Sequence, residues 1–428
     1  MKIKKEKLLN LTKQKSIIFQ NFYSQPFFLP FIFLLLSIIS LLIYSTFYPI
    51  PTEFYNSSIG ISSKLLNIGD RSFYLYDQNN LSLIKPSPLY PFILNTAKKF
   101  VGIWGLNEYS KLWNLIVISF TSILSLISLL FISSTAWQLF GRRVSIISSW
   151  IYVICPYTLF FSLNGSLTNY IFFGISYLCW IISRSQIFNK NFKGFDISQT
   201  LFHLSIASIY LSSLRVTGSL ISIIILLPVV IFSFLNYLKS PYSKVSIYSL
   251  IFALATLLFI LYQINQSYNY LNFSIKMFAS EPGSFLGVER QYLRSKIYEG
   301  SESNLEYLKK IVFLFLWKIS DFATGINDIR DTHTEFSNSI SNTPLMPFLT
   351  RVFTGIFYFI PINFTSFLGI IKFRKILVKS GFWLIIVAAI TVVSPSLIGV
   401  ANSRYLYMVY APFIIFSSAM FCEFFNEK

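Results

Sequence analysis

The chain has 428 residues, of which 54% are hydrophobic and only 12% charged, and its formal net charge is +18. Soluble domains carry about 25% charged residues, so this composition, with 18% aromatic residues, excludes a soluble globular domain and a disordered chain. A nucleic-acid-binding module is excluded as well, because the basic residues are spread between long apolar runs instead of gathering on one exposed domain.

Long apolar runs recur along the whole chain. A helix of about 20 apolar residues crosses the hydrocarbon core of a bilayer. The sequence therefore predicts an all-α polytopic membrane protein, a single integral membrane domain over 1–428 with about ten transmembrane helices. The runs centre on 27–47, 113–134, 144–162, 169–183, 200–214, 216–236, 246–265, 347–370, 380–398 and 404–422.

The placement of Lys and Arg predicts the orientation. With both termini in the cytoplasm, the cytoplasmic segments hold 18 basic residues and 4 acids, whereas the outer segments hold 17 and 13. Such an excess of positive charge marks the cytoplasmic side. The expected location is the plasma (inner) membrane. Two long outer loops, 48–111 and 266–346, carry most of the carboxylates, so we expect the chemistry at the outer face.

The first outer loop has a definite order of features. Glu53 directly follows the first apolar run, and 59–68 is apolar at helical spacing, which predicts an amphipathic helix lying in the membrane interface. Gly69 is a plausible helix stop. A proline-rich stretch at 85–91 then forms a rigid turn that returns the chain to the membrane.

This order resembles the GT-C class of membrane glycosyltransferases, in particular the bacterial branch related to protein O-mannosyltransferases and lipid A aminoarabinose transferases. The resemblance covers 25–240 and 345–422. It rests on the order of several short motifs. They are Leu65-Leu66-x-x-Gly69, Lys85-Pro86-x-Pro88-Leu89, Leu139-Phe140-Gly141-Arg142-Arg143, Pro156 before Ser166-Leu167-Thr168-Asn169, Leu214-Arg215-Val216-Thr217-Gly218, and Ser403-Arg404-Tyr405 with Pro412.

The resemblance implies an inverting glycosyltransferase that moves a sugar from a polyprenyl-phosphate carrier to an envelope lipid, glycan or protein at the outer face. Its partners would be this donor, this acceptor and membrane lipids, with no nucleic acid. No cofactor is required by the motifs, and a divalent cation stays open. Asp328, Asp331, His333 and Glu335 are more typical of a solvated loop than of a metal site.

Such an enzyme needs a carboxylate to deprotonate the acceptor hydroxyl. Glu53 is the first candidate, and Asp70 and Asp77 are rivals that are also typical turn formers. Two positions depart from the resembled family. Glu53 stands one or two residues before the usual Asp, and Asn169 stands where many relatives carry Glu, so an altered mechanism and an inactive relative both remain open.

Cations must offset the charge of the leaving lipid phosphate. Lys85, Arg215 and Arg404 are the candidates. Lys85 is chosen for its place in Lys-Pro-x-Pro, and Arg215 and Arg404 because each lies near the outer end of an apolar run. A basic residue there is functional by default, although Lys85 and Arg215 can also be read as interfacial anchors. Tyr405 is a further candidate contact, or an aromatic-belt residue.

Two other functions are compatible with the sequence. One is a lipid-linked glycan flippase or transporter, which is less favoured because such proteins tend to show repeats and this sequence shows none. An envelope-polysaccharide polymerase would use loop arginines such as Arg290 and Arg294. His203, in an apolar run, is predicted to be a hydrogen-bonded packing residue. The three cysteines are predicted to be buried thiols.

Overall fold

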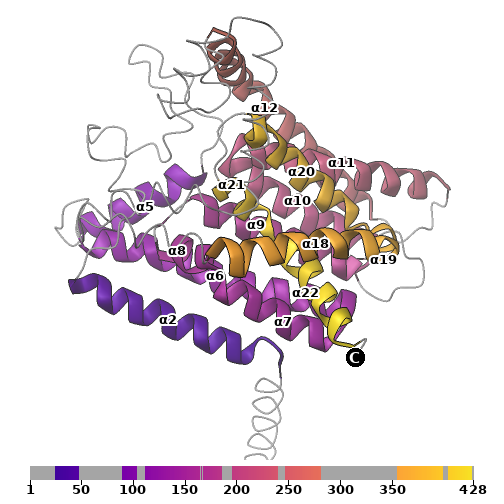
Figure 1. Ribbon diagram of the computed structural model, residues 1–428. Coiled ribbons are helices and arrows are strands. Elements are labelled where there is room, and N and C mark those ends of the chain that lie inside the picture. The colour runs from indigo at the N-terminus through magenta and orange to yellow at the C-terminus, as the bar shows by residue number, and fades with distance from the viewer. Residues whose placement is uncertain are drawn as a thin grey trace, which may run out of the picture.

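The computed structural model describes residues 25–47, 89–103, 111–163, 165, 167–185, 195–239, 246–280, 354–398 and 403–426. Within these ranges the regular structure is helical, with no strand (Figure 1). The elements are α2 (Phe28–Phe47), α5 (Leu89–Ile103), α6 (Lys111–Phe140), α7 (Arg142–Ile154), α8 (Pro156–Leu163), α9 (Leu167–Ser185), α10 (Ile197–Leu214), α11 (Val216–Lys239), α12 (Ile247–Ser280), η3 (Gly355–Phe359), α18 (Ile360–Lys372), α19 (Arg374–Ser380), α20 (Trp383–Ile398), α21 (Ser403–Met408) and α22 (Tyr410–Asn426).

Several of these helices are long and apolar enough to cross a membrane. Four pass by length and composition among the described residues, and up to six pass if each of two bent helix pairs is one span. The bent pairs are α7 with α8, at 58°, and α19 with α20, at 102°. The four helices are Leu115–Phe140, Thr217–Leu238, Ile247–Asn265 and Gly355–Lys372. The chain is therefore an all-α membrane protein over its described part.

Every apolar run of the sequence coincides with one or more helices. The 144–162 run is divided at Cys155, where Pro156 starts a new helix, because proline has no N–H to continue the hydrogen-bond ladder. The count of about ten spans stays a prediction. The interfacial helix expected at 59–68 and most of the second outer loop, including His333, lie outside the described residues.

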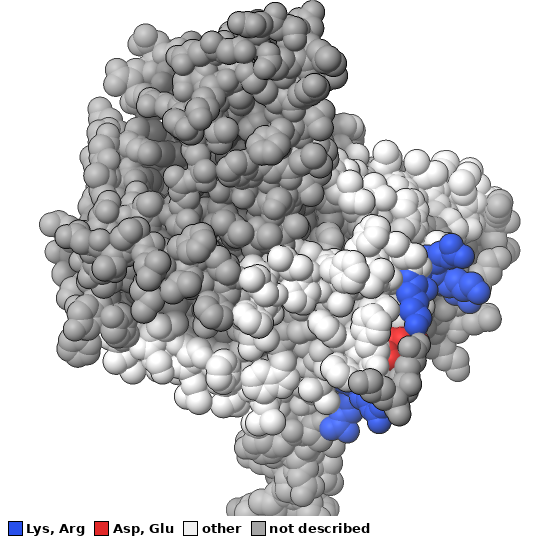
Figure 2. Space-filling view, viewed as in Figure 1, with Lys and Arg blue, Asp and Glu red and all other residues white. Residues whose placement is uncertain are grey.

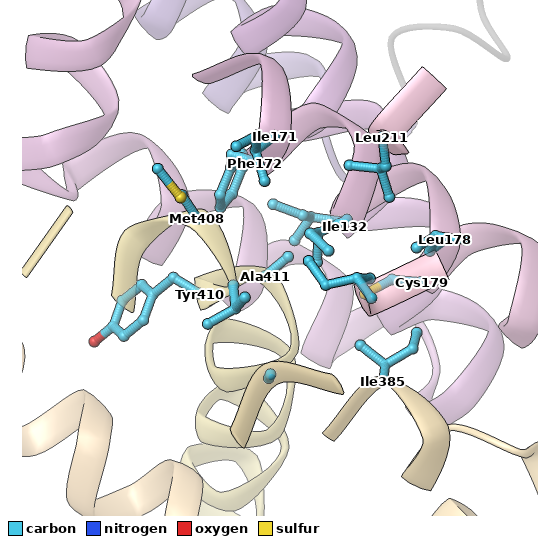
Figure 3. Close-up of a cluster of buried hydrophobic side chains, with 14 of the residues drawn as sticks. Ile132, Ile171, Phe172, Leu178, Cys179, Leu211, Ile385, Met408, Tyr410 and Ala411 are labelled. Carbon is cyan, nitrogen blue, oxygen red and sulfur yellow. The ribbon is translucent and has the colours of Figure 1, made fainter. Parts of the chain in front are cut away.

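The helices pack mainly as sequence neighbours. The helix α6 packs against α7 and α9, and α10 packs against α11 and α12. The helix α18 packs against α22, which follows it in the sequence after three intervening helices. Figure 3 shows where these groups meet, with buried apolar side chains contributed by α6, α9, α10, α20, α21 and α22. The labelled residues are Ile132, Ile171, Phe172, Leu178, Cys179, Leu211, Ile385, Met408, Tyr410 and Ala411.

The outer surface of the bundle is also apolar. Leu258 is 68% exposed and Phe357 72% exposed, and similar side chains cover α2, α11 and α18. An apolar surface of this extent is a liability in water. It suits lipid, where the helices satisfy their own backbone hydrogen bonds.

Candidate functional site

The sequence-derived candidates are unevenly covered by the structure. Glu53, Asp70, Asp77 and Lys85 lie outside the described residues. Arg404 and Tyr405 lie in the first turn of α21, where the backbone is described and the side chains are not. Among these candidates, Arg215 is the residue whose side chain the structure describes.

The bundle has two chemically different ends. One, called here the basic end, is formed by the α6–α7 junction, the end of α9 and the α18–α19 junction. The hydroxyl of Ser183 donates to Gln138 Oε1 at 2.8 Å, and the rings of Phe140 and Phe373 lie 5.1 Å apart, which brings these three places together. Figure 2 shows Lys and Arg side chains of the basic end gathered along the right-hand edge of the molecule. The basic end carries Arg142, Arg143, Arg184, Lys372, Arg374, Lys375 and Lys379.

The other end, called here the far end, is formed by the start of α5, the α8–α9 turn, the α10–α11 turn and the start of α21. The hydroxyl of Tyr90 donates to the Gly165 carbonyl at 2.9 Å, and its ring meets that of Tyr170 edge-on at 5.5 Å. The hydroxyl of Tyr210 donates to the Tyr170 carbonyl at 3.1 Å. These contacts tie α5, α9 and α10 together. Lys85 precedes Tyr90 by five residues in the sequence.

Arg215 occupies the turn between α10 and α11. It caps α10 in an extended conformation, and its N–H donates to the Leu211 carbonyl at 3.2 Å. The turn is tight because Gly218 touches α10, where a Cβ would overlap the Leu211 carbonyl oxygen. The Arg215 side chain is only 8% exposed. It is therefore drawn into the far end, unlike an anchor that reaches out to the headgroups.

The segment with Arg404 and Tyr405 meets the same end of the bundle. Two residues later, the ring of Tyr407 stacks on Phe172 in the second turn of α9, with 4.6 Å between centroids and 9° between planes. The Tyr407 hydroxyl donates to Thr158 Oγ1 at 3.4 Å. The start of α21 is thus held beside α9 and α8, at the end of the bundle that also contains Arg215.

Asn169 is fully buried against α6. Its amide nitrogen donates to the Thr121 carbonyl at 2.6 Å and to Ser125 Oγ at 2.8 Å. Its Oδ1 has no hydrogen-bond partner in the described part of the chain. At the position where the resemblance predicts Glu, the structure thus has a group that donates to protein oxygens and cannot serve as a base at neutral pH.

Further hydroxyls extend these contacts into a continuous network between α6, α7, α8 and α9. Ser162 hydrogen-bonds Ser125 Oγ at 2.6 Å and the Thr158 carbonyl, and Thr121 Oγ1 donates to the Ser162 carbonyl at 2.8 Å. We call this network the hydroxyl seam. It comprises Thr121, Ser122, Ser125, Tyr152, Thr158, Ser162 and Asn169. It contains no carboxylate, so it positions helices and does not supply a base.

His203 and the three cysteines lie in the described part of the chain, so the structure tests the predictions made for them. The Nδ1 atom of His203 hydrogen-bonds the Tyr177 hydroxyl at 2.8 Å, and its ring stacks on Phe195 at 5.0 Å, which confirms a packing role. Cys155, Cys179 and Cys422 are buried and free, as predicted. No group of three or more His, Cys, Asp or Glu side chains in the described ranges is arranged to hold a metal ion.

Sequence reasoning missed the tyrosines of the far end. Tyr90 was part of the proline-rich motif, and Tyr170 follows Asn169 directly, so both stood beside residues already singled out. A tyrosine at the end of an apolar helix is usually read as an aromatic-belt residue. Here Tyr90 is buried and joins two helix ends instead.

The comparisons with known proteins are sparse. No protein-family model and no curated protein matches the chain. Among solved structures, it is similar to the oligosaccharyltransferase of Archaeoglobus fulgidus in the apo form, with a TM-score of 0.39 and 14% sequence identity. The match covers 78% of this chain and 42% of that one, so the chain spans less than half the length of its neighbour. A likeness of this size carries no conclusion about activity.

Proposed function

We propose that the chain is a membrane glycosyltransferase that takes a sugar from a polyprenyl-phosphate carrier and transfers it, with inversion, to an envelope acceptor. The reaction would take place at the far end of the bundle. The basic end then faces the cytoplasm by the positive-inside rule, and the far end faces the outer side. The proposal combines the resemblance of the sequence motifs with the geometry of the described helix ends.

The observation that carries this proposal is the burial of Arg215. An arginine that is 8% exposed, at a tight turn between two apolar helices, is functional by default in a membrane protein. The phosphate of a lipid carrier is an anion that Arg can bind through two parallel hydrogen bonds. The start of α21, with Arg404, lies at the same end, and Lys85 precedes the start of α5 by four residues in the sequence, so we expect both to add charge to this phosphate site.

The proposed base is Glu53, with Asp70 and Asp77 as the rivals. Asn169 is not a replacement base, because its amide is used to hold α9 against α6. We therefore expect the base to come from the first outer loop, as the resemblance implies. Glu53→Gln keeps the size of the side chain and removes its basicity, so we expect turnover to fall on the order of 10²-fold.

Donor binding tests the role of Arg215. The full chain in lipid nanodiscs is titrated with a polyprenyl-phosphate sugar, and transfer to an acceptor extract is followed with a radiolabelled sugar. We expect Arg215→Gln to weaken donor binding by about 10²-fold, because a buried charge pair with the phosphate is lost. Arg215→Lys should recover only part of the affinity, since an ammonium lacks the planar fork of a guanidinium.

The matched control is Arg184→Gln. Arg184 is exposed on the neighbouring helix α9, but at the basic end, where it lies 5.7 Å from the Trp180 ring centroid. The Arg184→Gln substitution should leave donor binding unchanged. Equal donor affinity in Arg215→Gln and the unmodified chain would refute the phosphate site. Binding of the lipid-linked sugar without transfer would instead favour a flippase.

A further inference from the structure

The short helix α19 differs from the rest of the bundle in its direction and its surface. The candidate span that ends at Lys372 is followed directly by α19, and the chain then bends by 102° into α20. The helix therefore starts at the end of a candidate membrane span, where we expect the lipid headgroups to lie. Leu377 and Ser380 are buried, and the Phe373 ring just before the helix packs on Phe140 at 5.1 Å.

The opposite face of α19 is exposed and basic. Arg374, Lys375, Val378 and Lys379 are all exposed, and their spacing of one and four residues places them on one side of the helix. Val378 is 62% exposed and lies among the three cations. A face with long cationic side chains around an apolar one is typical of a helix that lies in a membrane interface.

The charges of this face are not neutralised by the described part of the chain. Arg374, Lys375 and Lys379 form no ion pair with a described residue, and the neighbouring acid, Glu423, is paired with Lys372 at 2.8 Å. Figure 2 shows basic side chains on both sides of one acidic side chain along this edge. The cationic surface therefore extends beyond α19 itself.

We propose that the exposed face of α19 binds the headgroups of anionic phospholipids. The phosphodiester of a lipid such as phosphatidylglycerol would contact Arg374, Lys375 and Lys379, while Val378 lies against the upper part of the acyl chains. Juxtamembrane cations of this kind attract anionic lipids. The lipid is a better fit than an acidic protein because an exposed apolar side chain lies among the cations, at the end of a membrane span.

This surface is separate from the proposed donor site. Arg215 lies at the far end of the bundle, whereas α19 lies at the basic end, so the two sites take different phosphates. The proposal does not depend on the glycosyltransferase function. It predicts a preference for anionic lipid in the intact protein even when no sugar donor is present.

The test uses the full chain purified in detergent and titrated with fluorescent phosphatidylglycerol or phosphatidylcholine. The unmodified chain should bind phosphatidylglycerol at least tenfold more tightly. The triple variant Arg374→Gln, Lys375→Gln, Lys379→Gln should lose this preference, since each cation near an anionic surface contributes about fivefold. Exchanging the cations, as Arg374→Lys, Lys375→Arg and Lys379→Arg, should keep it.

Lys99→Gln is the matched control, because Lys99 is an exposed cation of a different helix, α5. It should keep the full preference. If the triple variant fails to fold, Lys375→Gln and Lys379→Gln are measured singly, and each should weaken phosphatidylglycerol binding about fivefold. An unchanged preference in the triple variant or the folded single variants overturns the proposal. Binding of a polyglutamate peptide, together with equal binding of phosphatidylglycerol and phosphatidylcholine, would also overturn it.

Discussion

Two helix interfaces of this protein are held together in different ways. The hydroxyl seam between α6 and α9 is built from directional hydrogen bonds, such as those from Asn169 to Thr121 and Ser125. The interface between α18 and α22 also has hydrogen bonds, from the Tyr410 hydroxyl to Asn363 Oδ1 at 3.0 Å and between the Thr365 and Ser417 hydroxyls at 2.7 Å. Its distinguishing feature is close backbone contact, because Gly369 lies directly on the backbone of Phe416. Lipid offers no hydrophobic drive between helices, so these two means, packing and polar contact, are what remain.

The two interfaces also differ in the substitutions that they tolerate. Beside the α18–α22 interface, the Phe416 ring of α22 lies between Phe140 at the end of α6, at 5.5 Å, and Phe382 just before α20, at 5.7 Å. The fit of the α18–α22 interface depends on shape, so any added atom must displace a helix. The hydroxyl seam depends on donors and acceptors, so it tolerates a change of shape better than the loss of a hydrogen bond.

The largest predicted effect is in the close-packed interface. A Cβ at Gly369 would overlap the Phe416 carbonyl oxygen, which belongs to a helix backbone and cannot turn away. We expect Gly369→Val to lower the free energy of unfolding by about 3 kcal/mol. Reversible unfolding in mixed micelles measures this loss. Gly102→Val, where nothing lies within 4 Å of the added Cβ, is the control and should cost much less.

A smaller effect is expected for Asn169→Leu in the hydroxyl seam. The apolar side chain removes the amide donor from Ser125 and the Thr121 carbonyl, at a cost of about 1–2 kcal/mol. Asn169→Asp should cost more, because it puts a second acceptor against the same oxygens. The same unfolding assay separates the two variants. A more stable Asp variant would contradict the assignment of the amide nitrogen as the donor.

Individual hydroxyls of the seam should contribute less. A double-mutant cycle of Ser125→Ala and Asn169→Ala isolates the hydrogen bond between these residues, for which we expect about 0.6 kcal/mol, the average for polar contacts between membrane helices. Ser205→Ala is the control, since Ser205 donates to Leu201 of its own helix. A coupling energy of zero would mean that the seam owes its stability to packing.

The smallest effect is expected for the ion pair that joins α18 to α22. Lys372 Nζ lies 2.8 Å from Glu423 Oε1, and the two side chains are 41% and 37% exposed. Exposed pairs contribute little, so Lys372→Gln should change the free energy of unfolding by less than about 0.5 kcal/mol. A loss comparable to that of Gly369→Val would show that charge, and not shape, holds this interface.

The sequence predicted the helices well, because each apolar run is long and the signal is summed over many residues. It did not predict how the helices meet. Asn169 finds Thr121 and Ser125, which are more than 40 residues away, and no pattern within the chain indicates this pairing. The glycine at 369 gave no signal either, since its role depends on the approach of another helix.

The candidate site was predicted only in part for the same reason. Arg215 stood out because it is a charge between two apolar runs, and its place at a tight turn followed from the lengths of those runs. Its burial could not be predicted, because burial depends on how other parts of the chain pack around the turn. The tyrosines that join the far end were hidden among 26 tyrosines with no local feature to distinguish them.

The hydroxyl seam has a consequence for how the protein is made. Thr121 Oγ1 has one hydrogen and two acceptors, the Ile118 carbonyl of its own helix at 2.9 Å and the Ser162 carbonyl at 2.8 Å. Ser125 likewise can donate to the Thr121 carbonyl, at 3.2 Å. As a nascent segment, α6 can therefore enter the bilayer alone, with these hydroxyls satisfied internally. When α8 and α9 arrive, Thr121 Oγ1 gains the Ser162 carbonyl as an additional acceptor, and Ser125 Oγ accepts from Ser162 and Asn169 while it keeps its own bond. Biosynthesis of α6 therefore need not wait for its partners.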